Sequence, residues 1–183
     1  MRLLERVDEA VVVLAFLRAE LDSARFGAAL REALARAGTT DALVVDARLG
    51  DAAENALRHR VLHDYRGAYF GQNLDDLVWY RAACTRDEVL LIRTIAWDFW
   101  LDVTDGTRLP AAAAARLRAE GGDERFVPGG QPLIVVRANP EAHVMVVEGH
   151  GRLVAMAMHP EELPPEVELL LGERETIRRW SLY

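Results

Sequence analysis

The order of predicted elements in the second half of the chain constrains the fold most. Apolar and β-branched residues predict a strand over Gln131–Val136 and a second over His143–Val147, joined through an Asn139-Pro140 turn. Glycines follow the second strand, and an apolar segment predicts a short helix over Gly151–Met158 before a third strand over Val167–Leu171. A hairpin followed by a helix and a returning strand is typical of a small α/β module.

The first half is predicted to be mainly helical. Apolar residues around most of a helix predict a largely buried first helix over Leu4–Glu20. Capping residues predict a second helix over Ser23–Ala37 and a third over Asp51–Tyr65. The glycines of the segment Tyr65–Asp76 predict a loop.

Two patterns occupy the middle of the chain. Thr85 and Glu88 have capping-box spacing, but Val89–Ile92 is equally typical of a strand, so both alternatives stay open. Apolar and polar residues then alternate, which predicts a strand with one mostly buried face formed by Trp97, Phe99, Leu101 and Val103. An Asp-Gly pair at positions 105 and 106 predicts the turn that ends this strand.

An Ala-rich helix over Pro110–Glu120 opens the second half, with proline in the first turn, where it suits a helix. The chain is therefore predicted to be α+β, with a mainly helical N-terminal region over residues 1–104 and an α/β module over residues 105–183. We expect the two to pack together, because no linker rich in proline, glycine and serine separates them.

Composition excludes several classes of chemistry. The chain contains no lysine, so all 22 basic residues other than histidine are arginines. A P-loop, a Schiff-base lysine and a catalytic lysine base are excluded, whereas arginine is suited to gripping phosphate. Cys84 is the only cysteine, so an internal disulfide and a Cys-rich zinc site are excluded as well.

Net charge and hydropathy argue against two kinds of binding partner, nucleic acids and membranes. A net charge of −7 disfavours a nucleic-acid partner, because non-specific affinity for DNA depends on cationic side chains. No apolar run approaches the roughly 20 residues needed to cross a bilayer, and Val11–Leu17 lacks the basic leader of a secretory signal. We therefore expect a cytoplasmic protein without a membrane partner.

The motif that most favours chemistry is Glu148-Gly149-His150-Gly151-Arg152. A strand ends at Glu148 and a helix begins within three residues, so the first amides of that helix lack backbone partners and carry partial positive charge. Gly149 and Gly151 would let a ligand approach the backbone closely, because they have no side chains. Arg152 lies in the first turn of the predicted helix, where the partial positive charge of the helix dipole disfavours a cation unless an anion is bound nearby. The motif predicts a phosphate site. The alternative is a tight glycine turn in which Arg152 pairs with a surface carboxylate.

The order of helix, strand, hairpin strand, G-x-x-R box, helix and strand from Gly106 to Gly172 resembles the ParB/sulfiredoxin superfamily. The matching pieces are Gln131-Pro132-Leu133-Ile134-Val135-Val136, Val144-Met145-Val146-Val147 and Gly149-His150-Gly151-Arg152. The resemblance implies that the box holds nucleotide phosphates. Its D/E-G-H-x-R form is similar to the box of nucleotide-dependent free-serine kinases.

Two branches of the superfamily match less well. Sulfiredoxins have Gly-Cys-His-Arg, whereas His150 stands in the place of their reactive cysteine and Cys84 lies far away in sequence. Partition proteins of chromosomes carry a helix-turn-helix domain after the box, whereas only the residues up to Tyr183 follow the box in this sequence. Neither sulfiredoxin chemistry nor a partition role is therefore expected.

The resemblance and the residue chemistry together assign roles. Glu148 is the candidate metal ligand, for magnesium, or a general base, and His150 would contact phosphate or pass a proton. Gly149, Gly151 and Arg152, with His150, would bind the nucleotide cofactor. A carboxylate at a helix N-terminus is also a common cap, so a structural role for Glu148 stays open.

Four further residues are candidates for the pocket of a second substrate, namely Asp98, Thr107, Arg108 and Gln131. A solvated surface is the alternative for the first three. His59 and His63 are four residues apart on a predicted helix, a spacing that can hold a metal, but no third ligand is evident.

The leading hypothesis is a nucleotide-binding protein that uses a nucleoside triphosphate or diphosphate with Mg²⁺ for phosphoryl or nucleotidyl chemistry on a small molecule. One alternative is a non-catalytic module that a nucleotide switches or that binds a protein partner. The other is a DNA-associated nuclease of the ParB-like kind.

Overall fold

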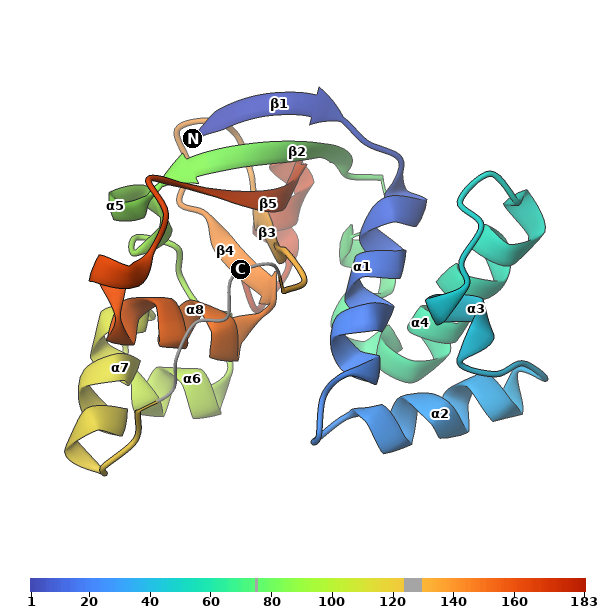
Figure 1. Cartoon of the computed structure of the whole chain (residues 1–183). Helices are drawn as coiled ribbons and strands as arrows, with labels where there is room; N and C mark the ends of the chain where they lie inside the picture. The colour runs from blue at the N-terminus through green and yellow to red at the C-terminus, as the bar shows by residue number, and fades with distance from the viewer. Residues whose placement is uncertain (75, 124–129) are drawn as a thin grey trace. The chain divides into compact units, whose positions relative to one another are not determined.

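The computed structural model describes residues 1–74, 76–123 and 130–183, with side chains up to Gly67 in the helix that ends at Leu74. The chain forms two compact units. Met1–Arg6 and Asp76–Tyr183 make the first, which we call the sheet unit, and Val7–Asp75 makes the second, which we call the helical unit. The helical unit is thus an insertion in the sequence of the sheet unit (Figure 1).

A five-stranded mixed sheet organises the sheet unit, in the order β1-β2-β5-β3-β4. Its strands are β1 (Arg2–Arg6), β2 (Val78–Thr85), β3 (Leu133–Arg137), β4 (Met145–Glu148) and β5 (Glu166–Glu173). β3 and β5 run parallel, and the other neighbours are antiparallel. All residues of β3 are buried, whereas those of the edge strand β1 are exposed, which explains why only the inner strands are strongly apolar.

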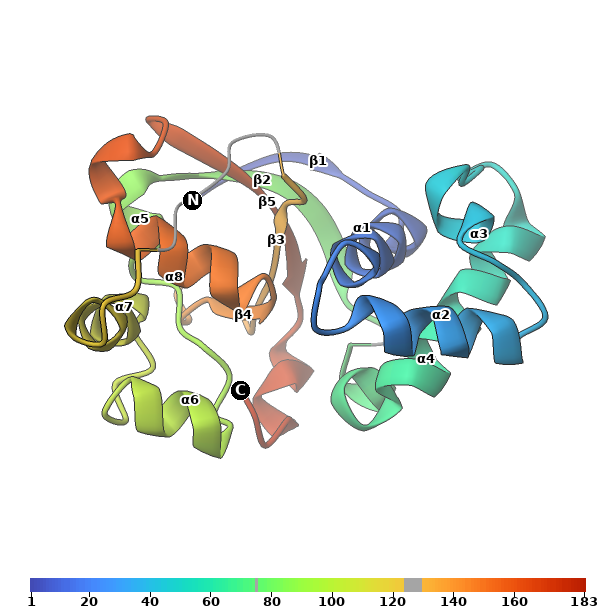
Figure 2. The ribbon, with the colours of Figure 1, turned by 60° about the horizontal axis from the view of Figure 1, so that its bottom comes forward.

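Helices complete the sheet unit. They are α5 (Arg86–Val89), α6 (Asp98–Val103), α7 (Pro110–Ala119), α8 (His150–Met158) and the 3-10 helices η1 (Pro160–Glu162) and η2 (Glu175–Arg179). Figure 2 shows α6, α7 and α8 beside one another on the same side of the sheet.

The fold fixes α8 between the sheet and α7. Leu153 and Met156 of α8 belong to one buried cluster with residues of β3, β4 and β5. Val154 and Ala157, on another side of the same helix, pack against Ala113 of α7. Each large apolar side chain buried in this way contributes roughly 1.5 to 3 kcal/mol of transfer free energy. The helix that follows the glycine box therefore has little freedom to shift.

The helical unit contains α1 (Glu9–Leu21), α2 (Gly27–Arg36), α3 (Ala42–Val45) and α4 (Ala52–Leu74). Asp8 caps α1 by accepting a hydrogen bond from the Ala10 amide at 2.8 Å. Leu17, Leu30 and Leu34 are fully buried and make its apolar core.

Two buried charges are also built into the helical unit. Arg58 is fully buried and donates hydrogen bonds to the carbonyl oxygens of Leu43 (2.9 Å) and Arg48 (3.1 Å). Glu20 is 3% exposed and accepts from Arg66 Nη2 at 2.7 and 2.8 Å. The Tyr65 hydroxyl also donates to Glu20 at 2.8 Å. These bonds tie α1, α3 and α4 together, because a buried charge must be compensated.

The predicted α+β class is confirmed, but the units divide at other positions than the predicted boundary between residues 104 and 105. The sheet unit recruits β1 and β2 from the first half, neither of which was predicted. Edge strand β1 has no apolar face, and the predicted first helix over Leu4–Glu20 in fact begins at Glu9. The predicted loop Tyr65–Asp76 was wrong up to Leu74, since α4 continues through its glycines.

The strand predicted from Trp97 to Val103 was also wrong, because this segment is helix α6. Six residues are too few to distinguish strand alternation from a short helix, and no residue of α6 is buried. The predicted turn is present, but it ends a helix: the Gly106 amide donates to the Leu101 carbonyl at 2.8 Å, with Gly106 at φ +74°. Thr85 and Glu88 form a capping box at the start of α5, so the helix is confirmed here in preference to the strand.

Among the described residues, no helix combines the length and the apolarity that a membrane span requires.

We expect Arg66→Ala to lower the free energy of unfolding by about 3 kcal/mol, because it leaves the Glu20 carboxylate buried without its cation. Urea denaturation followed by circular dichroism measures this loss. Arg36→Ala is the matched control, since its ion pair with Glu32 is exposed and should contribute less than about 1 kcal/mol. Equal losses in the two variants would contradict a structural role for the buried pair.

Candidate functional site

The candidate site begins at the junction of β4 and α8, where Gly149 is required. Its φ of +102° lies in the left-handed region, and it stands at the N-cap position without any side-chain cap. A Cβ at this position would lie 2.6 Å from Leu133 Cδ2 and 2.8 Å from Arg152 Nη2. The chain can therefore turn from strand to helix this tightly only at a glycine.

The first turn of α8 carries backbone amides that no described residue satisfies. Leu153 donates to the Gly149 carbonyl at 2.8 Å, and so begins the helical ladder. Within residues 1–74, 76–123 and 130–183, no acceptor binds the amides of His150, Gly151 and Arg152. Gly151 is exposed, and a Cβ there would have no described atom within 4 Å. A negatively charged ligand would find partial positive charge and open space at this turn.

Arg152 folds back over Gly149 from the same turn. Its Nη2 donates to the Pro132 carbonyl and to Glu148 Oε1, both at 3.4 Å, and its side chain is 27% exposed. Burial lowers the pKa of the guanidinium below its ordinary value, and Glu148 partly offsets this effect. Its Nε is buried and has no hydrogen-bond partner in the described part of the chain. The long bonds leave donor capacity for a stronger acceptor.

Glu148 ends β4 with a half-buried side chain that is 20% exposed. Its carboxylate forms an ion pair with Arg152. The sequence left two roles open for Arg152, namely phosphate binding and pairing with a carboxylate. The contact between Arg152 and Glu148 is compatible with both roles. As one carboxylate, Glu148 fits a magnesium ion that takes most of its ligands from phosphate and water.

His150 faces α6 and the segment before it. Its ring stacks on Trp100 with centroids 4.9 Å apart and planes at 17°. Its Nε2 accepts a hydrogen bond from the Ile95 amide at 3.5 Å, so the ring proton belongs on Nδ1. Burial lowers the pKa of His150 to about 3. At neutral pH the ring is uncharged, and its Nε2 is an acceptor directed to the protein backbone.

An apolar pocket of about 240 Å³ adjoins the exposed side of the box, between α6, α7 and α8. Gly151 and Val154 of α8 form part of its wall. The other lining residues are Phe99, Trp100, Val103, Ala113, Arg116, Leu117 and Glu120. Arg116 pairs with Asp102 at 3.0 Å and with Glu120 at 3.4 Å. The pocket therefore has a mainly apolar lining, charged side chains at its rim, and the exposed first turn of α8 at one side.

The four residues predicted for a second-substrate pocket are not brought together as a group. Asp98 is exposed in the first turn of α6, and Gln131 is half-buried beside Pro132, whose carbonyl accepts from Arg152. Thr107 is exposed, and its hydroxyl donates to the Thr104 carbonyl at 2.7 Å.

Arg108, the fourth, is committed to internal hydrogen bonds. It donates to the carbonyl oxygens of Thr94 (2.8 Å), Leu182 (3.3 Å) and Tyr183 (2.9 Å). Its backbone has φ +62°, and burial lowers the pKa of its guanidinium. Arg108 therefore links its own segment to Thr94 and to the C-terminal residues Leu182 and Tyr183. These bonds give a structural role to a residue that was predicted to bind substrate.

Trp100 and Ile95 were not predicted to belong to the site. The predicted strand placed Trp97 and Phe99 on its buried face and Trp100 on the opposite face, whereas Trp97 and Phe99 are in fact 45% and 53% exposed. Phe99 and Trp100 line the apolar pocket together, and a contiguous apolar surface of this kind is a signal of a binding site. No feature of the sequence could have identified the Ile95 amide, because backbone hydrogen bonds across the fold leave no residue signature.

Gly149→Ala and Gly151→Ala should act in opposite directions on stability. The first forces a side chain into a left-handed, crowded position and should cost about 1 to 3 kcal/mol. The second adds a better helix former where there is room and should be neutral or stabilising by up to about 1 kcal/mol. Thermal and urea unfolding of both variants measures the difference. If Gly149→Ala left the free energy of unfolding unchanged, the left-handed turn described at this position would be disproved.

His150 should remain neutral from pH 8 to pH 5. Its folded-state pKa is about 3, whereas an unfolded histidine titrates near 6.5. The unfolded chain therefore binds a proton first, and the stability present above pH 6.5 is lost as the pH falls toward 3, by up to about 1.4 kcal/mol per pH unit from this group. NMR titration of the ring carbons of the folded protein tests this expectation. A His150 midpoint near 6.5 would contradict it.

Comparisons with protein-family models, curated proteins and solved structures found no match for this chain. Membership of the ParB/sulfiredoxin superfamily therefore stays a prediction from the sequence motif. The function has to be argued from the geometry of the α8 turn and the pocket beside it.

Proposed function

We propose that this protein binds a nucleotide, with the phosphates at the first turn of α8 and the nucleoside in the apolar pocket between α6, α7 and α8. Phosphoryl or nucleotidyl transfer to a small molecule is the reaction that we infer from this arrangement. The observation that carries the proposal is the conjunction, at one helix terminus, of an Arg152 guanidinium with a buried Nε and three backbone amides, all without a hydrogen-bond acceptor among the described residues.

Charge and geometry support phosphate as the ligand at this turn. Arg152 approaches the turn from the side of Gly149, while Gly151 leaves the other side open. A phosphate there would accept from the amides and from the guanidinium, which binds planar or tetrahedral oxyanions through more than one N–H. It would also replace bonds to Pro132 and Glu148 that are only 3.4 Å long.

The pocket supports a nucleoside as the rest of the ligand. Phe99 and Trp100 offer aromatic surfaces on which a flat base would stack. Gly151 belongs both to the pocket wall and to the amide turn, so one molecule would contact the two regions at once. A nucleotide combines the apolar ring and the anionic group that this joint surface requires.

Magnesium and catalysis belong to the same proposal. Mg²⁺ would be held by the phosphates and by Glu148, and its chemistry would be the neutralisation of charge on the transferred group. Glu148 would alternatively take a proton from the acceptor substrate. His150 would position Trp100 and the segment at Ile95 through stacking and its hydrogen bond, which differs from the direct phosphate contact expected from the sequence.

One observation favours the second candidate, a nucleotide-binding module without turnover. His150 is neutral with its Nε2 directed to the backbone, and Glu148 is paired with Arg152. Both candidate acid–base groups of the box therefore already contact the protein itself. Nucleotide binding without loss of the γ-phosphate would favour this module over an enzyme. For either function we propose a cytoplasmic location, where the buried thiol of Cys84 would remain reduced.

Calorimetric titration with ATP, ADP, CTP and GTP, each with Mg²⁺, tests the proposal. We expect at least one nucleotide to bind, and Arg152→Ala to weaken it by about 10- to 100-fold, the value of hydrogen bonds to a charged group. Arg178→Ala is the matched control, because this arginine pairs with Glu175 on the surface and should leave affinity unchanged.

A second variant separates binding from folding. Gly151→Asp places an acidic side chain in the first turn of α8, where it should leave stability unchanged or raise it by about 0.3 to 1 kcal/mol. The same charge should repel phosphate and weaken nucleotide binding at least tenfold. Failure of every nucleotide to bind the folded protein, or full affinity in Gly151→Asp, would overturn the proposal.

A further inference from the structure

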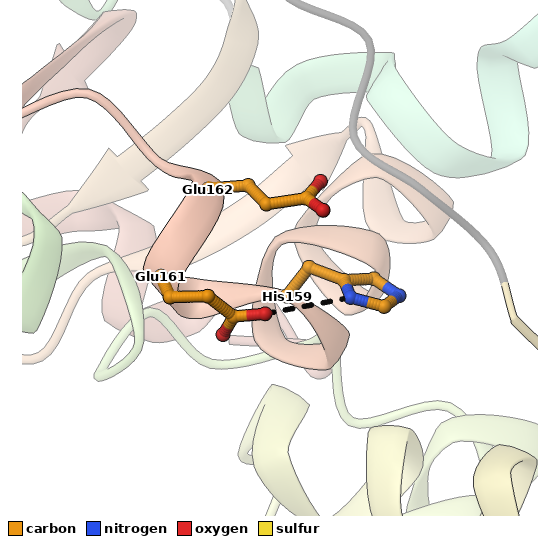
Figure 3. Close-up of side chains that lie close together, drawn as sticks. All are labelled: His159, Glu161 and Glu162. Carbon is orange, nitrogen blue, oxygen red and sulfur yellow. Dashed lines mark ion pairs between the residues drawn. The ribbon is translucent and has the colours of Figure 1, made fainter.

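The opposite end of α8 carries a second cluster of side chains with a different chemistry. His159 follows the last residue of α8, and Glu161 and Glu162 lie in the 3-10 helix η1. One ligand atom from each of the three lies within 4.8 Å of the others. Figure 3 shows the imidazole of His159 facing the carboxylate of Glu161, with the Glu162 carboxylate extending on the side of the imidazole.

Local sequence holds these side chains in place. His159 leaves the helix with φ −131° and ψ 62°, and Pro160 begins η1, so the chain turns sharply between the helices. Arg118 of α7 donates to the Ala157 carbonyl at 3.3 Å and also to that of Met158. The end of α8 is therefore fixed by α7 and does not depend on the cluster itself.

Asp123, from outside η1, determines which nitrogen of His159 is available. Its Oδ1 lies 2.9 Å from His159 Nε2, and Glu161 Oε1 lies 3.6 Å from His159 Nδ1. An ionised carboxylate is only an acceptor, so in the neutral ring Nε2 carries the proton and donates to Asp123. The lone pair of Nδ1 then faces the oxygen of Glu161. Such carboxylate–histidine pairing is typical of histidines that bind a metal through the other nitrogen.

The distances suit a cation shared by Nδ1 and the two carboxylates. Ligand bonds of about 2.1 Å in a tetrahedral zinc site place neighbouring ligand atoms about 3.4 Å apart, close to the 3.6 Å between Nδ1 and Glu161. The C-terminal end of α8 also carries partial negative charge, which favours a cation beside it. Both glutamates are exposed, so an ion could enter from solvent and keep water as a further ligand.

We propose that His159, Glu161 and Glu162 form a binding site for a divalent transition-metal ion of the Zn²⁺ or Mn²⁺ kind, with Asp123 orienting the histidine. An imidazole nitrogen with two carboxylate oxygens suits these ions better than Mg²⁺ or Ca²⁺, which prefer oxygen ligands alone. The site is independent of the nucleotide proposed at the other end of α8, and it uses none of the same residues.

Titration of the protein with Zn²⁺ by calorimetry, and with Mn²⁺ by the paramagnetic broadening of histidine NMR signals, tests the site. We expect one Zn²⁺ to bind, and Mn²⁺ to broaden the His159 ring signals before those of other histidines. His159→Ala should weaken Zn²⁺ affinity by at least about tenfold, and Asp123→Asn by about tenfold, the usual effect of losing an orienting carboxylate. Mg²⁺ in excess should not compete.

Two kinds of variant keep the test independent of folding. Glu161→Gln and Glu162→Gln alter exposed side chains without changing their shape, and each should also weaken Zn²⁺ binding. His59→Ala is the matched control, because it removes a different exposed histidine near a carboxylate, Glu9. Full Zn²⁺ affinity in His159→Ala, or an equal loss in His59→Ala, would overturn the site and leave the cluster as surface ion pairs.

Discussion

The sheet unit depends on β5, the strand that pairs with partners from both halves of the sequence. β5 is antiparallel to β2 along all eight residues from Val78 to Thr85, and parallel to β3 along all five from Leu133 to Arg137. Its Leu169 and Leu171 lie in the buried cluster that also receives α8. Without β5, β1 and β2 would be separated from the β3–β4 hairpin, and the apolar face under α8 would be open to water.

That central pairing explains why a helical unit can be inserted after β1. β1 and β2 need only reach adjacent places in the sheet, and the residues between them form a compact unit around a core of their own. The helical unit contains its own buried ion pair of Glu20 and Arg66 and its own buried Arg58. The terminal nitrogens of both arginines donate to acceptors within the unit, whereas the Nε of each is buried without a hydrogen-bond partner among the described residues.

α8 joins the two sites proposed for the sheet unit. Its N-terminus presents, beside Arg152, amides for which the described part of the chain provides no acceptor, and its C-terminus lies beside His159 and the glutamates of η1. A helix has opposite partial charges at its ends, so the proposed anion and the proposed cation each lie where the backbone field favours them. Burial of the helix between the sheet and α7 keeps both termini in fixed positions.

The sequence by itself determined the elements whose signals are local. The hairpin of β3 and β4, helix α8 and strand β5 were predicted from apolar runs and breakers, and the position of Gly149 followed from the turn between strand and helix. Only the tertiary structure decided the rest. It placed β1 and β2 in the sheet, made residues 98–103 a helix, and joined His150 to Trp100 and Ile95. These outcomes depend on contacts between segments that are distant in sequence. A short sequence pattern does not indicate which distant segment will cover an element or form hydrogen bonds with it.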